Sequence, residues 1–281
     1  MAALPKFKWQ TLCFFAVSVF LMVIALAPFV FMLISSFKPG LYLMRNGITF
    51  NVDFSIMHIN NYGLLFTDHN GLYFRWYFNS LLITFLQTAF ALFLSCAVGY
   101  GLGVYRFRGR NVIFVMVLMV MMVPMEILML PLFRMLIGAG LTNTYAGVIL
   151  PFAVSPFAIF FFRQYAVSLP QDYLDAARID GCGEYKIFLR ICMPLMTPAI
   201  GAMAILLAMF SWNAVLWPMI VMGSREMMTL PVGLSTLITP YGNNFDLLLP
   251  GAVLAVVPIL TIFLFNQRFF IDGMTAGGIK G

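Results

Sequence analysis

The segment DAARIDGCGEYKIFLRICMPLMTP, Asp175 to Pro198, carries six charged residues in a chain of which only 9% is charged. Its pattern predicts a helix, a turn and a second helix. Asp172, Asp175 and Arg178 recur at three-residue spacing, which places them at adjoining positions on one helical face. Gly181 favours the left-handed backbone conformation that ends a helix. A concentration of charge in one short segment of so apolar a chain indicates a specific role for that segment, and the role has to be inferred from the rest of the sequence.

The boundaries and faces of the two helices can also be predicted. Ser168 and Gln171 have the spacing of a capping box, and Pro170 suits the first turn of a helix. Ala176 and Ala177 are expected to leave a smooth surface where another protein's backbone could approach. In the second helix an apolar stripe at i, i+3, i+4 and i+7 is expected from Tyr185, Phe188, Leu189 and Cys192. These residues alone leave two interpretations open, a helix pair resting on the membrane surface and a docking surface for another protein.

The composition identifies an integral membrane protein. The 281 residues are 62% hydrophobic with a mean hydropathy of +0.97, whereas soluble domains are about 25% charged. The net charge of +6 does not indicate a nucleic-acid partner, because the basic residues are scattered between apolar runs rather than gathered on one face. The first apolar run is long enough to span a bilayer, so it is expected to remain as a helix rather than act as a cleaved signal peptide.

Six apolar runs reach the roughly 20 residues that a helix needs to cross a 30 Å hydrocarbon core. They lie at Thr11–Ser35, Asn79–Tyr105, Val112–Leu136, Tyr145–Tyr165, Pro198–Met222 and Leu247–Phe265. The sequence therefore predicts an all-α integral membrane protein with six transmembrane helices, forming a single transmembrane domain over residues 1–281.

Lysine and arginine divide unequally between the two sides of these spans, eleven against five. The richer side holds Lys6, Lys8, Arg106, Arg108, Arg110, Arg163, Arg178, Lys186, Arg190, Arg268 and Lys280. The poorer side holds Lys38, Arg45, Arg75, Arg134 and Arg225. By the positive-inside tendency, both termini and the charged segment are expected to be cytoplasmic, and the long loop after the first span is expected to be external.

The charged segment resembles the EAA loop of ABC importer permeases, in which Glu-Ala-Ala is followed by a glycine, an isoleucine and a proline at fixed spacing. The resemblance implies a cytoplasmic coupling loop at residues 166–199 that docks on an ATPase. Its expected contact residues are Asp175, Ala176, Ala177, Arg178, Asp180, Gly181, Glu184, Ile191 and Pro194. Asp175 stands where glutamate is usual, which shortens the reach of the carboxylate by one methylene.

The resemblance extends over most of the chain, in the manner of the smaller permease of maltose-type carbohydrate importers, which have the type I importer fold. Stretches that carry it are SSFKPG, VPMEILMLPLF, GVILPF, SWNAVLWPMIV and the ending GMTAGGIKG. FFFRQYAVSLPQDYLDAARIDGC, MMTLPVGLSTL and TPYGNNFDLL are most similar to permeases for arabinose and arabino-oligosaccharides. The alternative is a related permease for another solute, such as other oligosaccharides or glycerol 3-phosphate.

This resemblance implies a division of labour in a bacterial cytoplasmic (inner) membrane, where the chain would be a multi-pass subunit. An extracytoplasmic sugar-binding protein would deliver the sugar, a homologous second permease would complete the pathway, and an ABC ATPase dimer would bind ATP and Mg. The sequence itself contains no GxxxxGK[ST] phosphate-binding loop and no convergent set of acid, base and nucleophile. We therefore expect no catalytic residue, no metal site and no cofactor on this chain, and neither an enzyme nor a channel acting alone.

Two groups of residues in the membrane have open roles. Glu126 is ionisable at membrane depth, so it is expected either to line the pathway or to form a structural pair, for instance with Arg134. Trp212, Asn213 and Trp217 could offer stacking faces and hydrogen bonds to sugar, and helix packing or interfacial anchoring explains them equally well.

Two further contacts are suggested outside the spans. The external stretch Thr239–Pro250 contains Tyr241, Asn243 and Asn244, which are expected either to meet the binding protein or to form a simple solvated turn. The cytoplasmic tail at residues 266–281 ends in small residues, and the resemblance implies that Gly277, Gly278 and Lys280 contact the ATPase. A frayed end is the alternative for this tail.

Overall fold

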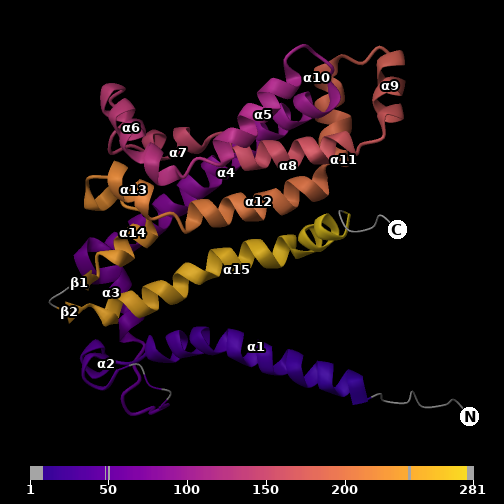
Figure 1. The fold of residues 1–281 in the computed structure, drawn as a ribbon. Helices are drawn as coiled ribbons and strands as arrows, with labels where there is room; N and C mark the ends of the chain where they lie inside the picture. Colours follow the sequence, from indigo (N-terminus) through magenta and orange to yellow (C-terminus); the bar gives the residue numbers. More distant parts are fainter. Residues whose placement is uncertain (1–8, 48, 50, 240–241, 277–281) are drawn as a thin grey trace, which may run out of the picture. The chain divides into compact units, whose positions relative to one another are not determined.

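The computed structural model describes residues 9–47, 49, 51–239 and 242–276 of the chain, and almost all of its regular structure is helical (Figure 1). The helices in the first part are α1 (Trp9–Ser35), α2 (Gly40–Asn46), α3 (Asn60–Thr67), η1 (Asp68–Asn70), α4 (Leu72–Val104), α5 (Arg110–Met121), α6 (Met125–Gly138), α7 (Tyr145–Ile149) and η2 (Leu150–Phe152). The later elements are α8 (Pro156–Val167), α9 (Gln171–Ile179), α10 (Glu184–Ile187), η3 (Phe188–Cys192), α11 (Met193–Leu195), α12 (Thr197–Trp212), α13 (Leu216–Val221), η4 (Arg225–Met227), α14 (Leu230–Ser235), β1 (Ile238–Thr239), β2 (Gly242–Asn243) and α15 (Phe245–Ala276).

Within the described residues, three helical stretches are long and apolar enough to cross a bilayer: Thr11–Ser35, Leu72–Val104 and Phe245–Phe265. Three further candidates are pairs of helices bent at a break, α5 with α6 by 101°, α7 and η2 with α8 by 42°, and the α10–α11 stretch with α12 by 78°. Counting each bent pair as one span gives up to six, so the six-span topology stays a prediction.

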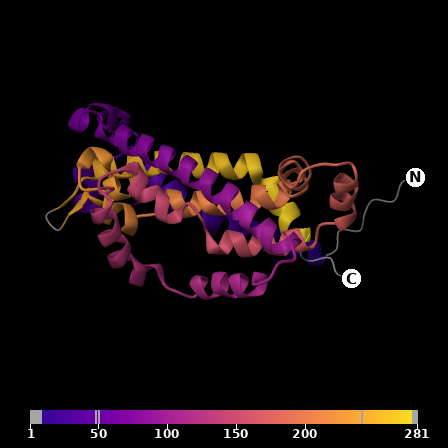
Figure 2. The same cartoon turned by 90° about the horizontal axis from the view of Figure 1, so that it is seen from above.

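Proline accompanies each of these breaks. Pro124 precedes α6, Pro156 opens α8 and Pro198 lies in the first turn of α12. Proline lacks a backbone N–H and is tolerated where a helix starts but not in its interior. The chain therefore ends one helix and starts another inside a single apolar run, and Figure 2 shows this break between α5 and α6.

The chain divides into two compact units. The first combines the residues up to Tyr73 with Leu234–Val256, and the second combines Phe74–Gly233 with the residues from Val257 onward. Both units draw on segments that are distant in sequence, since α4 begins in one unit and continues in the other, and so does α15.

In the first unit, polar contacts hold the turn after α1. The buried Lys38 donates from Nζ to the Thr49 carbonyl at 2.7 Å, and Asn61 donates from Nδ2 to the carbonyls of Ser36 and Lys38 at 3.0 and 2.9 Å. Asp246 accepts from the Gly40 amide at 2.6 Å. A Cβ at Gly40 would lie only 2.6 Å from this carboxylate, which explains glycine in the SSFKPG stretch.

In the second unit, α4, α8 and α12 form the main core with the α9–α11 segment. Buried residues of this core include Phe162, Ala166, Leu174, Cys192 and Met203. A smaller cluster surrounds Trp217, Val148 and Ile149. Gly99 and Gly103 lie one turn apart on α4 and let it approach α8, because a Cβ at either position would lie 2.7–2.8 Å from a Cβ of α8.

Candidate functional site

The charged segment folds as two helices joined by a turn, as the sequence predicts. α9 ends at Ile179, Gly181 has φ +75°, and α10 starts at Glu184. The left-handed conformation predicted for Gly181 is confirmed. No atom lies within 4 Å of a Cβ built there, so glycine is required by the backbone conformation and not by crowding.

The predicted capping box at the start of α9 is wrong. The residue before the first helical turn is Pro170, and it provides no side-chain cap. The hydroxyl of Ser168 instead donates to the Tyr165 carbonyl at 2.7 Å, at the end of α8. Ser168 is therefore used to finish one helix, because the proline at 170 already supplies an extended conformation from which α9 can begin.

Arg178 links the two helices of the segment. Its Nη1 donates to Oδ1 of Asp175 at 2.8 Å, and its Nε donates to Oε1 of Glu184 at 2.9 Å. The other oxygen of Glu184 accepts from the Tyr105 hydroxyl at 2.7 Å. One guanidinium therefore connects α9 to α10, and Glu184 connects both to Tyr105, directly after the end of α4.

The same contacts determine the charge states of Glu184 and Arg178. The hydrogen bond from Arg178, followed by that from Tyr105, lowers the pKa of the Glu184 carboxyl from its ordinary value. The hydrogen bond to Glu184 is in turn the main cause that raises the pKa of Arg178 further above its ordinary value. Both groups are therefore charged at neutral pH, and the geometry of the turn is held by charge-assisted hydrogen bonds.

The inner face of the segment packs into the core of the second unit. Leu174, Ala177, Ile187 and Cys192 are all buried there. The expectation of a smooth outer surface at both alanines is wrong for Ala177, which faces the core, whereas Ala176 is exposed. Ala177 is buried because α9 is amphipathic: Leu174 and Ala177 are three residues apart and share its inner face.

The apolar stripe predicted for the second helix is only partly correct. Phe188 and Cys192 are buried, but Tyr185 is 88% exposed and Leu189 is 50% exposed. The cause is η3, a π-helical stretch from Phe188 to Cys192 that follows α10 directly. A π-turn adds a residue to the helical turn, so a stripe predicted with a period of 3.6 residues does not continue through it.

The exposed side of the segment combines charge with large apolar side chains. Asp175 and Asp180 are exposed, and Ile179 and Tyr185 have 86% and 88% of their surfaces exposed. Neither Ile179 nor Tyr185 was predicted as a contact residue, although an isoleucine directly before Asp180 in a charged stretch is a recognisable signal. Apolar and aromatic groups at the centre of a polar rim are typical of protein interfaces.

The remaining two predicted contact residues lie within and just after the π-helical stretch. Ile191 is half-buried and packs against the core, and Pro194 is exposed in α11. The Pro194 carbonyl accepts from the hydroxyl of Thr197, the first residue of α12, at 2.7 Å. All nine predicted coupling residues lie between positions 175 and 194, and among them Arg178 contacts both Asp175 and Glu184.

The intramembrane candidates are placed differently from the coupling residues. Glu126 is exposed in the first turn of α6, and no ion pair joins it to Arg134 in the described part of the chain. Trp212 and Trp217 are both 3% exposed, and Trp217 donates from Nε1 to the Gly147 carbonyl at 3.3 Å. The burial of the two indole rings favours the packing interpretation over a stacking surface for sugar. Asn213 is exposed and donates to the Met209 carbonyl at 2.8 Å.

The external stretch forms a short hairpin that leads into α15. β1 and β2 pair in antiparallel register, with Ile238 opposite Asn243, and the Asn244 side chain accepts from the Leu247 amide at 3.3 Å. Tyr241 lies outside the described residues, and so do Gly277, Gly278 and Lys280 of the tail. Among the described residues, no group of three His, Cys, Asp or Glu side chains could hold a metal ion.

These features define the class of protein: a helical membrane protein that presents a rigid, charged two-helix segment with an exposed apolar centre. The chain belongs to the family of binding-protein-dependent transport system inner membrane components, whose family model matches residues 95–275. The match includes the complete charged segment.

Individual relatives support this assignment. The chain is 51% identical over 277 residues to the arabinooligosaccharides transport system permease protein AraQ of Bacillus subtilis, covering 99% of this chain and 98% of that protein. It is 33% identical to the lactose transport system permease protein LacG of Rhizobium radiobacter, covering 92% of each. A crystal structure of a bacterial ABC transporter involved in the import of the acidic polysaccharide alginate has the same fold, with a TM-score of 0.80 at 22% identity and coverage of 95% and 100%.

Proposed function

We propose that this chain is a permease subunit of an ATP-driven importer of arabino-oligosaccharides. The observation that carries the proposal is the 51% identity over 277 residues to a permease named for these sugars. An identity of this extent favours the same solute, because the matched residues include all the segments that would surround the pathway.

The topology is part of the proposal. We place six spans in a bacterial cytoplasmic membrane, with both termini and the α9–α10 segment on the cytoplasmic side. Three long helices and three bent pairs in the structure support the number of spans, with α12 rather than α10 as the membrane part of the third pair. The unequal division of lysine and arginine, eleven against five, supports the orientation.

We further propose that the chain works with three kinds of partner. A homologous second permease would enclose the pathway, an extracytoplasmic sugar-binding protein would deliver the sugar, and an ABC ATPase dimer would bind ATP and Mg. The membership of a family described as binding-protein-dependent supports the delivery step. On this proposal the chain itself binds no cofactor and performs no bond chemistry.

Coupling is assigned to the outer side of the α9–α10 segment. The Arg178 contacts to Asp175 and Glu184 hold the two helices as one body, and the packing of Leu174 and Ile187 fixes that body to the core of the second unit. A movement of a docked ATPase would therefore be passed to α4, α8 and α12 rather than lost in a flexible loop. Rocking of packed helices around a pathway is a general mode of alternating access.

The sequence leaves other solutes open as alternatives, such as other oligosaccharides or glycerol 3-phosphate. The sn-glycerol-3-phosphate transport system permease protein UgpE of Agrobacterium fabrum is 30% identical to this chain over 202 residues, covering 71% of it. Both the identity and the coverage are well below those of the relative named for arabino-oligosaccharides. We therefore favour the sugar.

The test is uptake by cells that lack this chain and are complemented with it. Cells carrying the wild-type chain are expected to accumulate labelled arabinotriose, and cells carrying an empty vector are not. Labelled glycerol 3-phosphate is the matched second substrate and is expected to enter both strains equally. Complementation that restores glycerol 3-phosphate uptake and not arabinotriose uptake would contradict the proposal.

A further inference from the structure

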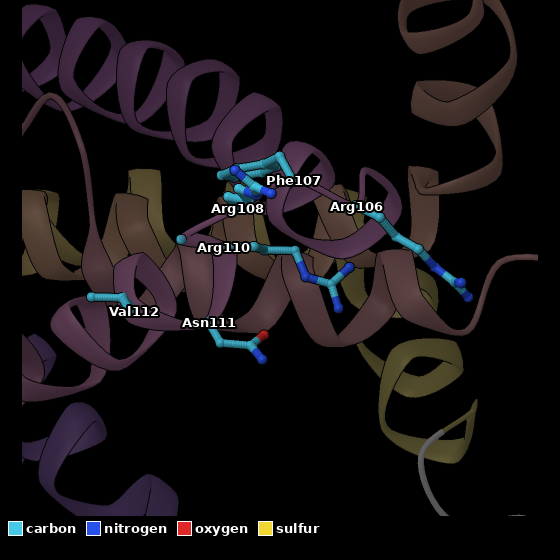
Figure 3. Close-up of a pocket in the computed structure, with 7 residues that line it drawn as sticks. Arg106, Phe107, Arg108, Arg110, Asn111 and Val112 are labelled. Atoms are coloured by element: carbon cyan, nitrogen blue, oxygen red, sulfur yellow. The ribbon is translucent and has the colours of Figure 1, made fainter.

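Three arginines lie within five residues where the loop after α4 leads into α5, in the stretch Arg106-Phe-Arg-Gly-Arg110. They line an open depression of about 470 Å³ together with Phe107, Gly109, Asn111 and Val112 (Figure 3). The positive-inside tendency accounts for basic residues at this end of the spans, but it does not require that they line a depression.

The guanidinium groups are available to a ligand. Arg106 and Arg108 are exposed, and no hydrogen bond joins either side chain to another described residue. Arg110 donates from Nη1 to the Tyr105 carbonyl at 3.1 Å, which orients the guanidinium, and its other N–H groups make no hydrogen bond to the described part of the chain. Figure 3 shows the side chains of Arg106 and Arg110 extending to the same side of the loop.

The backbone adds to the positive charge. α5 starts at Arg110 behind Gly109, which has φ +88° and no side chain to cap the first amides of the helix. Unsatisfied N–H groups at a helix start carry a partial positive charge and favour an anion. Three guanidinium groups and a helix start around one depression are chemically suited to a phosphate ester.

An apolar track begins at the edge of this depression. Val112, Val115, Met116 and Met119 recur at i, i+3, i+4 and i+7 along α5, and each is between 46% and 63% exposed. The opposite side of α5 is packed against α8, where Phe114 stacks on Phe160 and lies under the Arg163 guanidinium at 3.9 Å. The track therefore faces away from the core of this unit.

The dimensions agree with one membrane leaflet. The 12 residues of α5 make a helix of about 18 Å, close to the roughly 15 Å that half of a hydrocarbon core occupies. A phosphate at the start of α5 would thus place an acyl chain along the exposed track down to the break before α6. A soluble phosphate would use the arginines but would leave the track uncovered.

We propose that the Arg106–Val112 depression binds the head group of an anionic phospholipid whose acyl chain lies along α5. Tyr105, which directly precedes the cluster, donates to Glu184, so the lipid would lie next to the α9–α10 segment. Its assignment to the inner leaflet rests on the proposed topology, whereas the binding itself does not. The site would tie the start of α5 and the end of α4 to the lipid composition of the membrane.

The experiment is native mass spectrometry of the purified transporter complex with dioleoylphosphatidylglycerol or dioleoylphosphatidylcholine added in detergent. The wild type is expected to retain phosphatidylglycerol preferentially. Each basic residue at a membrane surface accounts for about fivefold in affinity for anionic lipid, so Arg108→Gln should lose about fivefold and the triple variant of Arg106, Arg108 and Arg110 to glutamine considerably more. The matched control is the triple variant of Arg75, Arg134 and Arg225 to glutamine, which removes the same charge elsewhere and should bind as wild type.

Three outcomes would overturn the proposal. Equal lipid retention by the two triple variants would mean that the cluster is not the binding site. Displacement of the lipid by inorganic phosphate at the same concentration would assign a soluble anion. Loss of the second permease from the cluster variant, with unchanged phosphatidylglycerol retention by the permease that remains, would assign the apolar track to a protein contact. If the triple variant does not assemble, lipid retention by Arg108→Gln alone tests the proposal.

Discussion

At the scale of single residues, the coupling segment depends on Arg178 and Gly181. Arg178 joins carboxylates on both sides of the turn, and Gly181 supplies the backbone conformation that brings them together. The three-residue spacing of Asp175 and Arg178 predicts that they share a face, and their 2.8 Å contact confirms it. The contact of Arg178 with Glu184 could not be predicted in the same way, because it crosses a turn whose geometry spacing alone does not define.

Gly181→Val should impair transport without preventing insertion. A β-branched residue in the left-handed region costs about 1–2 kcal/mol, and this strain would tilt α9 against α10. Gly183→Val is the matched control, because Gly183 has φ −69° and open space around it. The uptake rate is measured at equal expression. Equal rates for the two variants would show that the turn geometry does not matter for coupling.

The rigidity of the segment should depend on pH through Glu184. The pKa of Glu184 is lowered in the folded protein, so its contribution to stability is present above its unfolded pKa, about 4.3, and is lost as the pH falls through the folded value. Hydrogen exchange of the α9 amides, corrected for intrinsic rates, should therefore accelerate in acid. The change should be at most about fivefold, because exposed ion pairs contribute about 0.2–1 kcal/mol.

Glu184→Gln provides the control for this pH dependence. The variant should show the faster α9 exchange already at pH 7 and no further acceleration as the carboxyl range is crossed. A variant that still loosens in acid to the extent of the wild type would place the sensitive group elsewhere.

At the scale of elements, the apolar runs predict where helices occur but not where they bend. The prolines at 124, 156 and 198 are visible in the sequence, yet a proline inside an apolar run is compatible with a kink, a break or a helix start. The π-helical stretch has no simple signal in the sequence. Because it changes the helical period, the predicted apolar stripe is wrong at Tyr185 and Leu189, which are exposed.

Close packing of α4 on α8 gives a prediction at this scale. A methyl group at Gly99 would lie 2.7 Å from the Phe162 Cβ and 2.9 Å from the backbone of α8, whereas one at Gly101 would meet nothing within 4 Å. Gly99→Ala should therefore destabilise the protein by about 1–3 kcal/mol through overpacking. Gly101→Ala should be neutral or mildly stabilising, since alanine is favoured over glycine in helices.

Thermal unfolding of the detergent-purified protein measures both glycine variants. A lower Tm for Gly99→Ala alone is the expected result. Equal Tm values for Gly99→Ala, Gly101→Ala and the wild type would mean that α4 and α8 are not packed as closely as the structure has them.

At the scale of the whole molecule, the sequence predicts the class of protein better than it predicts sites. The apolar composition and the ordered stretches indicate a membrane permease, and the family match agrees. The roles of Trp212 and Trp217 could not be predicted, because an indole in a span has the same sequence signal whether it meets sugar or a neighbouring helix. Many apolar side chains of α1, such as Phe14 and Phe15 at 75% and 68% exposure, have a physical explanation only in a lipid or partner environment.

The central claim is that the outer side of the α9–α10 segment docks on the ATPase, and photo-crosslinking tests it most directly. Tyr185→p-benzoylphenylalanine places a photoreactive group on a side chain that is 88% exposed and resembles the original. Phe54→p-benzoylphenylalanine is the matched control, at an 82% exposed position in the loop assigned to the external side. Irradiation of the assembled transporter in membranes should give an adduct with the ATPase from position 185 and none from position 54. Adducts of position 185 with lipid alone, or an ATPase adduct from position 54, would contradict the account.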